Sequence, residues 1–386
     1  MATAFDVIVL GVGGMGSAAC HQLASRGARV LGLEQFPLVH DRGSSHGETR
    51  IIRQAYFEHP NYVPLLKRAY DHWSRLEPDD PQRPGLFEQV GLVLSGRPDG
   101  ETIRGAKTSA EMHDLTIEEL TPIDATRRWP TFSFPADHVV VHEPIAGYLR
   151  VEACVQRQID VAVELGAQIH SGERVVEWSS NGTSVVVRTD RAEYSAASLV
   201  ITAGPWAGQC LDGLGLRLNV IRKFVGWFPI DASETSSVRR SFNQEMPTYL
   251  FELPHGAFYG FPSIDGSTVK VAEHSGGQPV PDPGHVDRQM HADDLLRLRQ
   301  FIEVHLPGLG HDPAKFSVCL YTMTPDQHFI VDLHPQWRNV AFAAGFSGHG
   351  FKFSPVMGEA LADLSLQQKT SLPIEFLSLQ RFHQPA

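Results

Sequence analysis

The sequence predicts a two-domain α/β fold, in which a parallel sheet covered by helices is joined to a second domain built on an antiparallel sheet. Three observations support this prediction. A strand, a glycine turn and a helix follow one another over residues 5–34, aromatic-rich strands fill residues 218–316, and parallel-type strands return after residue 318. The first domain is therefore predicted to consist of residues 1–85, 145–217 and 318–386, and the second of residues 86–144 and 218–317.

The glycine turn lies between a short apolar strand at residues 6–10 and a helical pattern that runs to about Arg26. Its first glycine permits a tight turn, a later one lets the backbone approach a pyrophosphate, and the last lets the helix lie close on the strand. The phosphates then lie at the helix N-terminus, where free N–H groups and the helix dipole attract anions. We therefore predict a dinucleotide site at Gly11, Gly13, Gly14, Met15 and Gly16.

A second strand at residues 29–33 ends on Glu34. An acidic residue at this distance from the turn is placed to accept hydrogen bonds from an adenosine ribose, and glutamate rather than arginine argues against a 2′-phosphate. The alternative interpretation, a chance glycine-rich turn, lacks the matching strand, helix and distal acid.

Composition excludes several classes of function. Charged residues make up 20% and hydrophobic residues 42% of the 386, as in ordinary globular proteins, and the net charge of −11 disfavours nucleic acid or an anionic membrane as the main partner. The four cysteines lie far apart without a CxxC pair, which predicts neither a disulfide framework nor a metal site. The first strand begins within five residues and no apolar run reaches membrane-spanning length, so we expect a cytoplasmic monomer without a membrane partner.

Further elements of the first domain follow from apolar spacing and turn residues. Helical spacing covers residues 61–77 and 151–165, and Asn181-Gly182 predicts a hairpin between strands at 174–177 and 184–189. A buried strand at 197–202 leads to Gly204, where the backbone is predicted to pass close to the cofactor. The other predicted first-domain elements are strands at 329–332 and 340–344 and a helix at 355–366.

The second domain is predicted from a change of pattern to short aromatic-rich strands. Segments rich in Pro and Asp at residues 77–84 and 132–137 mark the crossings between domains. The predicted elements are strands at 90–94, 224–228, 248–252, 257–261 and 268–272 and a helix at 292–306.

A second glycine loop, GFSGHGFKF, follows the strand at 340–344 and is predicted to face the same cofactor from the other side. Lys352 lies between two phenylalanines, where an ammonium is costly unless an anion pairs with it; otherwise it extends to solvent. His349 is as readily a packing residue as a proton carrier. The loop's glycines are Gly345, Gly348 and Gly350.

Arg50 and Arg53 are separated by two isoleucines, and both can point into a cleft if the segment is helical, or to one side of it if irregular. Their planar guanidinium groups suit a carboxylate or a flavin carbonyl, whereas the alternative is a surface basic pair. For three other residues the local sequence predicts a structural role only. Cys319 is interpreted as an inert core cysteine, Lys270 as a residue on the solvent face of a strand, and Tyr259 as a core aromatic.

Taken together, these motifs resemble the monomeric sarcosine oxidase and N-methyl-tryptophan oxidase family. The similarity runs in register over nearly the whole chain, and it rests on GVGGMG, SHGETRIIR, Tyr259 to Pro262, Lys270 to His274, Cys319 to Tyr321 and GFSGHGFKF. Family members are FAD amine oxidases whose flavin is attached through a cysteine thioether. The resemblance therefore implies a Rossmann-like FAD-binding domain, an antiparallel-sheet substrate domain and covalent FAD on Cys319.

The resemblance also implies roles for individual residues. Lys270 lies where oxygen is activated, Arg50 lies beside the flavin ring with His46 and Thr49, and Arg53 and Lys352 bind the substrate carboxylate. Tyr259, His274, Tyr321 and His349 surround the substrate, and the further cofactor contacts are Gly43, Ser44, Gly204, Gly345, Gly348, Gly350 and Phe351. Ser45, Glu48 and the wall segments 57–60, 225–227 and 250–251 depart from the family pattern, which leaves the preferred side chain open.

The predicted activity is oxidation of the N-methyl group of a secondary amino acid, sarcosine or N-methyl-tryptophan, by O₂ to give the demethylated amino acid, formaldehyde and H₂O₂. One alternative is a dehydrogenase or oxidase subunit acting on another secondary amine, such as pipecolate, proline or a fructosyl amino acid. Two others are an NAD-dependent dehydrogenase with the same fingerprint and a non-enzymatic nucleotide-binding module.

Overall fold

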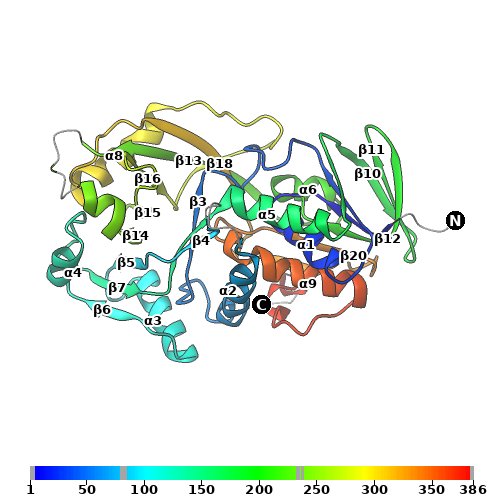
Figure 1. Cartoon of the computed structure of the whole chain (residues 1–386), viewed down its shortest axis with the longest axis horizontal. Coiled ribbons are helices and arrows are strands. Elements are labelled where there is room, and N and C mark those ends of the chain that lie inside the picture. Colours follow the sequence, from blue (N-terminus) through cyan, green and yellow to red (C-terminus); the bar gives the residue numbers. More distant parts are fainter. Residues whose placement is uncertain (1–4, 79–84, 232–234, 236–238, 383–386) are drawn as a thin grey trace.

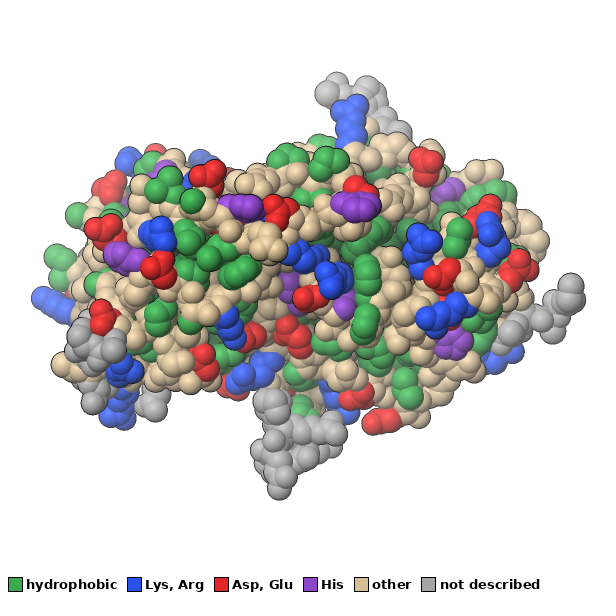
Figure 2. Space-filling model, turned by 90° about the horizontal axis from the view of Figure 1, so that it is seen from above, with side chains coloured by type: hydrophobic (Ala, Val, Ile, Leu, Met, Phe, Trp, Pro, Cys, Tyr) green, Lys and Arg blue, Asp and Glu red, His purple; other side chains and the backbone are tan. Residues whose placement is uncertain are grey.

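The computed structural model describes residues 5–78, 85–231, 235 and 239–382. Figure 1 shows two lobes along the long axis of the molecule, with α1 (Gly14–Ala24) and α9 (Ser354–Gln367) in one and α8 (Ala292–His305) in the other. No helix in the described part of the chain is long and apolar enough to cross a membrane. Acidic and basic side chains are interspersed over the face shown in Figure 2.

The first lobe is built on an eight-stranded sheet. Its central strand β1 (Phe5–Leu10) pairs in parallel with β2 (Val30–Glu34) and β12 (Glu193–Ile201). Helix α1 packs against α9 and α5 (Val151–Glu164), and its small, apolar residues are buried on nearly every side. The other strands are β9 (Gln168–Ser171), β10 (Val175–Ser180), β11 (Val185–Thr189), β19 (Ile330–Leu333) and β20 (Val340–Ala344).

The second lobe is built on a nine-stranded, mainly antiparallel sheet with an aromatic core that includes Phe251, Phe258 and Phe301. Its strands are β5 (Leu92–Gly96), β6 (Glu118–Leu120), β7 (Val139–Glu143), β13 (Asn219–Pro229), β14 (Thr248–Leu253), β15 (Gly256–Gly260), β16 (Thr268–Glu273), β17 (Gln278–Pro279) and β18 (Lys315–Met323). Besides α8, this lobe contains α3 (Glu101–His113), α4 (Pro122–Arg128) and η2 (Ser241–Glu245).

A small third sheet lies between the lobes in Figure 1 and consists of β3 (Thr49–Ile52), β8 (Gly147–Arg150) and β4 (Phe87–Glu88), next to α2 (Tyr62–Leu76). The short elements of the first lobe are η1 (Gly204–Trp206), α6 (Ala207–Cys210), η3 (Phe351–Phe353), η4 (Glu375–Leu377) and η5 (Leu379–Phe382). The arginine pair was expected on a helix or an irregular segment, but Arg50 lies on the strand β3.

The two-domain α/β fold and the Asn181-Gly182 hairpin are confirmed. One strand differs from expectation, because the chain was predicted to re-enter the first domain at residue 318. Strand β18 instead pairs with β13 over nine consecutive residue pairs in the antiparallel sheet, and the chain returns to the parallel sheet at β19. Helices α3 and α4 were not predicted, and the crossing at 77–84 lies mostly outside the described residues.

Candidate active site

A cavity of about 1160 Å³ is lined by residues from both large sheets. One part is lined by the glycine turn together with Glu34, Phe36 and Trp206, and another by Arg53 and Lys352. The cavity therefore joins the predicted nucleotide site to the predicted carboxylate site.

The glycine turn has the form needed to receive a dinucleotide. A Cβ on Gly16 would lie 1.7 Å from the carbonyl oxygen of Gly11, so only glycine lets α1 approach β1 this closely, whereas a Cβ on Gly13 would meet no atom within 4 Å. Glu34 accepts hydrogen bonds from the N–H groups of Val12, at 2.9 Å, and Phe36, at 3.1 Å. A carboxylate has about four acceptor sites, so Glu34 still has capacity for a ribose hydroxyl.

The polar loop that follows β2 lies over the N-terminus of α1. The Ser45 hydroxyl accepts a hydrogen bond from the Gly14 N–H at 3.2 Å, and the Ser44 hydroxyl donates to the Leu320 carbonyl at 2.6 Å. At the end of the loop, the Glu152 carboxylate accepts from the Gly47 N–H at 2.6 Å. The loop is thus fixed to α1, α5 and β18 at once.

Cys319 lies behind the cavity wall, where its sulfur meets a guanidinium. Arg50 Nη2 lies 3.1 Å from the sulfur and 2.8 Å from the carbonyl oxygen of Ser44. Burial raises the pKa of the thiol, but the charges of Arg50 and then His46 outweigh it, and the pKa of Cys319 falls to about 6. The thiolate is the nucleophilic form of cysteine, so this sulfur is activated at neutral pH.

Lys270 was expected on the solvent face of its strand. The residue is instead buried, with 3% of its surface exposed. Its ammonium donates hydrogen bonds to the carbonyl oxygens of Gly47, at 2.6 Å, and Thr49, at 2.9 Å. It also lies 5.5 Å from the centre of the Trp227 ring. Burial, reinforced by the charge of Arg50, holds the pKa of Lys270 well below its usual value.

Arg53 is buried in an ion pair with Glu58, a residue of the wall segment 57–60 to which sequence reasoning gave no role. Its Nη2 lies 2.8 and 2.6 Å from the two carboxylate oxygens, and its guanidinium lies 4.2 and 4.1 Å from the ring centres of Tyr56 and Phe57. Burial raises the pKa of Glu58, but Arg53 and other nearby cations lower it to about 2. Glu58 is therefore ionised throughout the physiological range.

Lys352 lies close to the same pair and is buried rather than extended to solvent. Its ammonium donates to the His349 carbonyl at 2.7 Å, and burial together with the charge of Arg53 lowers its pKa to about 7. The site therefore contains two cations and one internal carboxylate. An incoming anion would favour the charged form of Lys352.

His349 is held in one tautomer by its two hydrogen-bond partners. Its Nε2 lies 2.9 Å from the Gln327 carbonyl oxygen, which only accepts, so Nε2 donates and Nδ1 accepts from the Tyr56 hydroxyl at 2.5 Å. Burial lowers its pKa to about 4, which keeps the ring neutral.

Two tyrosines and a histidine also line the cavity. These are Tyr259, His274 and Tyr321, and the Tyr321 hydroxyl lies 3.3 Å from Nδ1 of His274. Burial lowers the pKa of His274 to about 3, so this ring is also neutral.

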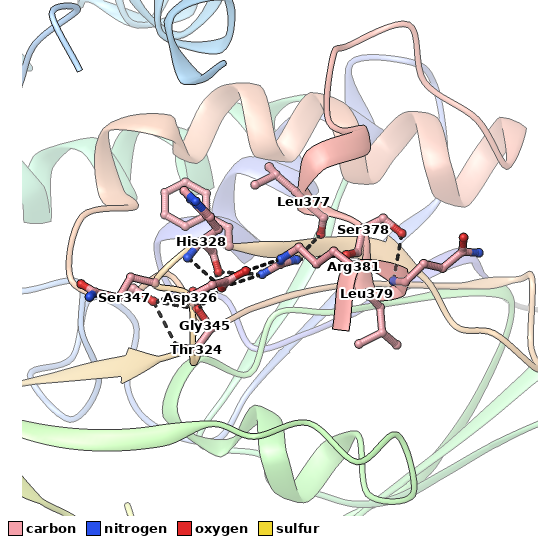
Figure 3. A network of polar contacts seen from close by, with 12 residues as sticks. Thr324, Asp326, His328, Gly345, Ser347, Leu377, Ser378, Leu379 and Arg381 are labelled. Atoms are coloured by element: carbon pink, nitrogen blue, oxygen red, sulfur yellow. Dashed lines mark hydrogen bonds and ion pairs between the residues drawn. The ribbon is translucent and has the colours of Figure 1, made fainter. Parts of the chain in front are cut away.

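The second glycine loop is fixed from below by a polar network that reaches the end of the described chain (Figure 3). Arg381, in η5, donates to Asp326 at 2.7 Å, and Asp326 accepts from the Thr324 hydroxyl at 3.1 Å. The Thr324 N–H in turn donates to the Ser347 hydroxyl at 3.2 Å. These bonds hold Ser347 at φ +46°, a left-handed conformation that costs a non-glycine residue about 1–2 kcal/mol.

The loop also packs directly against the aromatic wall. Gly348 has φ +81°, and a Cβ there would lie 2.3 Å from the Tyr321 ring. Only glycine therefore lets the backbone approach this ring so closely.

The predicted residues fall into two layers. The cavity is lined by Arg50, Arg53, Tyr259, His274, Tyr321, His349, Lys352, Gly11, Gly13, Gly14, Met15, Glu34, Gly43, Ser44, Gly204, Gly345, Gly348, Gly350 and Phe351. Behind this wall lie Gly16, His46, Thr49, Lys270 and Cys319. His46 reaches the Gly43 carbonyl oxygen at 3.2 Å through Nε2, and Lys270 reaches the Thr49 hydroxyl at 3.1 Å.

Sequence reasoning missed Tyr56 and Glu152, whose partners are remote in the chain, and it gave Glu58 no role beyond its place in the wall segment 57–60. Glu58 had one available signal, since an acid five positions after a predicted anion-binding arginine is a candidate partner for it. The pairing of Glu152 with the loop at 47–48 had no local signal.

The profile of the FAD dependent oxidoreductase family DAO matches residues 6–364. Monomeric sarcosine oxidase of Bacillus sp. (strain B-0618) is 38% identical over 99% of this chain and 97% of its own length, and N-methyl-L-tryptophan oxidase of Yersinia pestis (strain Pestoides F) is 33% identical over 98% and 99%. The structure of a Tyr258Phe mutant of NikD, an amino acid oxidase of nikkomycin biosynthesis, matches with a TM-score of 0.84 and 26% identity over 97% of this chain and 96% of that one.

Proposed function

Because the chain belongs to the DAO family of FAD-dependent oxidoreductases, we propose that it oxidises the N-methyl group of a secondary N-methyl amino acid, of the sarcosine or N-methyl-L-tryptophan type. The amine, O₂ and water give the demethylated amino acid, formaldehyde and H₂O₂. The observation that carries this proposal is the pair of buried cations, Arg53 and Lys352, in the same cavity as the glycine turn.

The residues present fit FAD. The turn at 11–16 and Glu34 would hold its adenosine diphosphate part, and the loop at 43–50 and the second glycine loop would enclose its ring system. When bound, FAD supplies the acceptor for a hydride equivalent and passes two electrons to O₂. We infer that the Cys319 thiolate attaches it through a thioether, a step that removes one C–H and one S–H hydrogen while O₂ takes up the two electrons and two protons as H₂O₂.

The chain's own groups bind and orient the substrate. Arg53 and Lys352 hold its carboxylate, which fixes the N-methyl group at one position and in one orientation. The neutral rings of His274 and His349 leave the amine without a repelling positive charge. Phe57, Leu92, Leu94 and Leu250 also line the cavity and offer apolar contact to a substrate side chain.

Arg53→Ala should raise the substrate KM at least about 30-fold, because losing one partner of a buried charge pair costs 2 kcal/mol or more. Steady-state kinetics with the best substrate would measure this. The double variant Arg53→Ala/Glu58→Ala removes the carboxylate that the single variant leaves unpaired. A KM unchanged in both variants would contradict the carboxylate role of Arg53.

Glu58→Gln should lower KM by about tenfold, the effect of removing roughly 1.4 kcal/mol of competition. Glu58 accepts hydrogen bonds from the Arg53 guanidinium, which a substrate carboxylate would also need as a donor. The negative charge of Glu58 also repels an incoming anion. Glutamine keeps the shape and loses the charge. A KM that rises instead would mean that Glu58 orients Arg53 for binding rather than competing with the substrate.

The proposed activity is tested by a peroxide-coupled screen of N-methyl amino acids, with pipecolate, proline and fructosyl amino acids included. We expect stoichiometric H₂O₂ and formaldehyde from one or more N-methyl compounds. Peroxide without formaldehyde would favour oxidation of another secondary amine. Reduction of an artificial acceptor without peroxide would indicate a dehydrogenase.

A further inference from the structure

Lys223 lies in the centre of the strands that form the wall behind the cavity. Strand β13 pairs with β16 on one side and with β18 on the other, so that Trp227 is opposite Lys270 and Lys223 is opposite Cys319. Side chains alternate along a strand, so Lys223 and Trp227 share a face of the sheet. Lys270 and Cys319 lie on the same face. The proposed activity gives both of them a role, but it gives Lys223 none.

The ammonium of Lys223 is held by three carbonyl oxygens in a row. It donates to His274 at 3.0 Å, Ser275 at 2.6 Å and Gly276 at 3.0 Å, which form the turn directly after β16. The residue is 4% exposed, and its nitrogen lies 5.2 Å from the centre of the Tyr321 ring. A single side chain thus contacts both partners of the His274 and Tyr321 pair.

We propose that Lys223 is a positioning residue, which fixes the turn at 274–276 and thereby holds His274 against Tyr321 in the wall of the substrate cavity. We call the hydrogen bonds from Lys223 to this turn the clamp. The effect of the clamp on substrate binding rests on the proposed function, whereas the clamp itself does not depend on that function. Lys223 acts through the backbone of the turn and makes no contact with the reacting atoms.

The clamp depends on the charge of the amine. An ammonium has three donors, whereas a neutral amine has two and a lone pair, so deprotonation removes one hydrogen bond and turns a lone pair toward a carbonyl. The charged or titratable groups that face Lys223 are Glu273, Arg297, Cys319 and the His274 and Tyr321 pair. Glu273 and Arg297 form an ion pair at 2.8 Å, which limits the net effect of either.

Burial lowers the pKa of Lys223 to about 8, against the opposing charges of Glu273 and Cys319. The ammonium is therefore present below this pKa, and the clamp weakens as pH rises through it. Alkylation of Cys319 would remove a negative charge and move this transition to lower pH.

Hydrogen exchange measured by mass spectrometry tests the clamp without substrate. Lys223→Met removes all three hydrogen bonds to the turn, so peptides spanning residues 272–280 should exchange at least about tenfold faster, which is the effect of losing even one hydrogen bond to a charged donor. If the methionine variant fails to fold, Lys223→Gln replaces it. Glutamine keeps two N–H donors, so exchange of the same peptides should increase by less than the increase expected for methionine. The matched control is Lys107→Met, which removes an exposed lysine paired with Glu119 and should leave these peptides unchanged.

Binding measurements test the consequence for the site. Lys352 titrates in the same range in both proteins, so the measured quantity is the ratio of the two Kd values for a non-oxidisable analogue with sulfur in place of the amine nitrogen. The Kd of Lys223→Met should exceed that of the wild type at low pH, and the ratio should fall as pH rises through about 8, where the wild type loses its own clamp. Unchanged exchange at 272–280 in Lys223→Met, or a Kd ratio that does not change with pH, would overturn the proposal. If no N-methyl amino acid is oxidised, the proposed function fails, and the exchange experiment still decides the clamp.

Discussion

Lys270→Met should slow reoxidation of the reduced flavin by O₂ about 100-fold or more, while anaerobic reduction by substrate keeps its rate. Developing superoxide is an anion, and removing one fixed group that stabilises a developing negative charge typically costs about 10²–10³ in rate. Methionine has a similar length and no charge. Stopped-flow measurement of the two half-reactions separates them.

The pH dependence of reoxidation gives a second measure of the same role. Burial holds the pKa of Lys270 well below its ordinary value, so the ammonium is lost at a lower pH than for an exposed lysine. We therefore expect the reoxidation rate to fall as pH rises through this lowered pKa, and the methionine variant to be slow at every pH.

Lys315→Met is the matched control for this prediction. Lys315 contacts the same indole as Lys270, with its nitrogen 4.6 Å from the centre of the Trp227 ring, but its side chain is 49% exposed. A charge in that position is screened by water and should contribute little. Equal reoxidation rates in wild type and Lys270→Met, or an equal loss in both variants, would reject a specific oxygen role.

Local sequence predicted the parts of the site that local backbone chemistry determines. The strand, glycine turn, helix and Glu34 lie within 34 residues, and their roles follow from backbone geometry. The second glycine loop was equally visible, because three glycines follow a buried strand. Each leaves no room for a Cβ, which would lie 2.3 Å from Thr324 at Gly345, from Tyr321 at Gly348 and from Phe346 at Gly350.

Residues whose environment is made by distant segments could not be placed in the same way. Lys270 alternates along its strand like a solvent-facing residue, and only the approach of the loop at 47–49 and of Trp227 buries it. Cys319 had no local signal either, since its activation depends on Arg50, 269 positions away. For both residues the family resemblance supplied a role that periodicity did not.

The misplacement of β18 has the same origin. Its apolar residues suited either sheet, and the decisive factor is a partner strand, β13, long enough to pair with all nine of its residues. This pairing places Cys319 on the antiparallel sheet, so we propose that the domain boundary predicted at residue 318 lies after β18. The proposed flavin attachment would then join the two lobes.

Cys319→Ser should abolish covalent attachment of FAD completely, so that acid precipitation leaves a colourless pellet and a yellow supernatant. A serine hydroxyl stays neutral beside Arg50 and cannot replace the thiolate as a nucleophile. The cavity and glycine turns do not involve this sulfur, so reversible binding of FAD should persist. Absorbance of the pellet and the supernatant measures the outcome directly.

Cys210→Ser provides the comparison, because burial raises the pKa of that thiol to about 11 and it has no cation to activate it among the groups that set this pKa. Its pellet should remain yellow.

The rate at which apoprotein captures added FAD covalently should rise with pH through about 6, because the Cys319 thiolate forms only as pH passes its lowered pKa. A rate that first rises near the pKa of an ordinary thiol, about 8.5, would mean that Arg50 does not activate this sulfur. A yellow pellet from Cys319→Ser would mean that another residue carries the flavin.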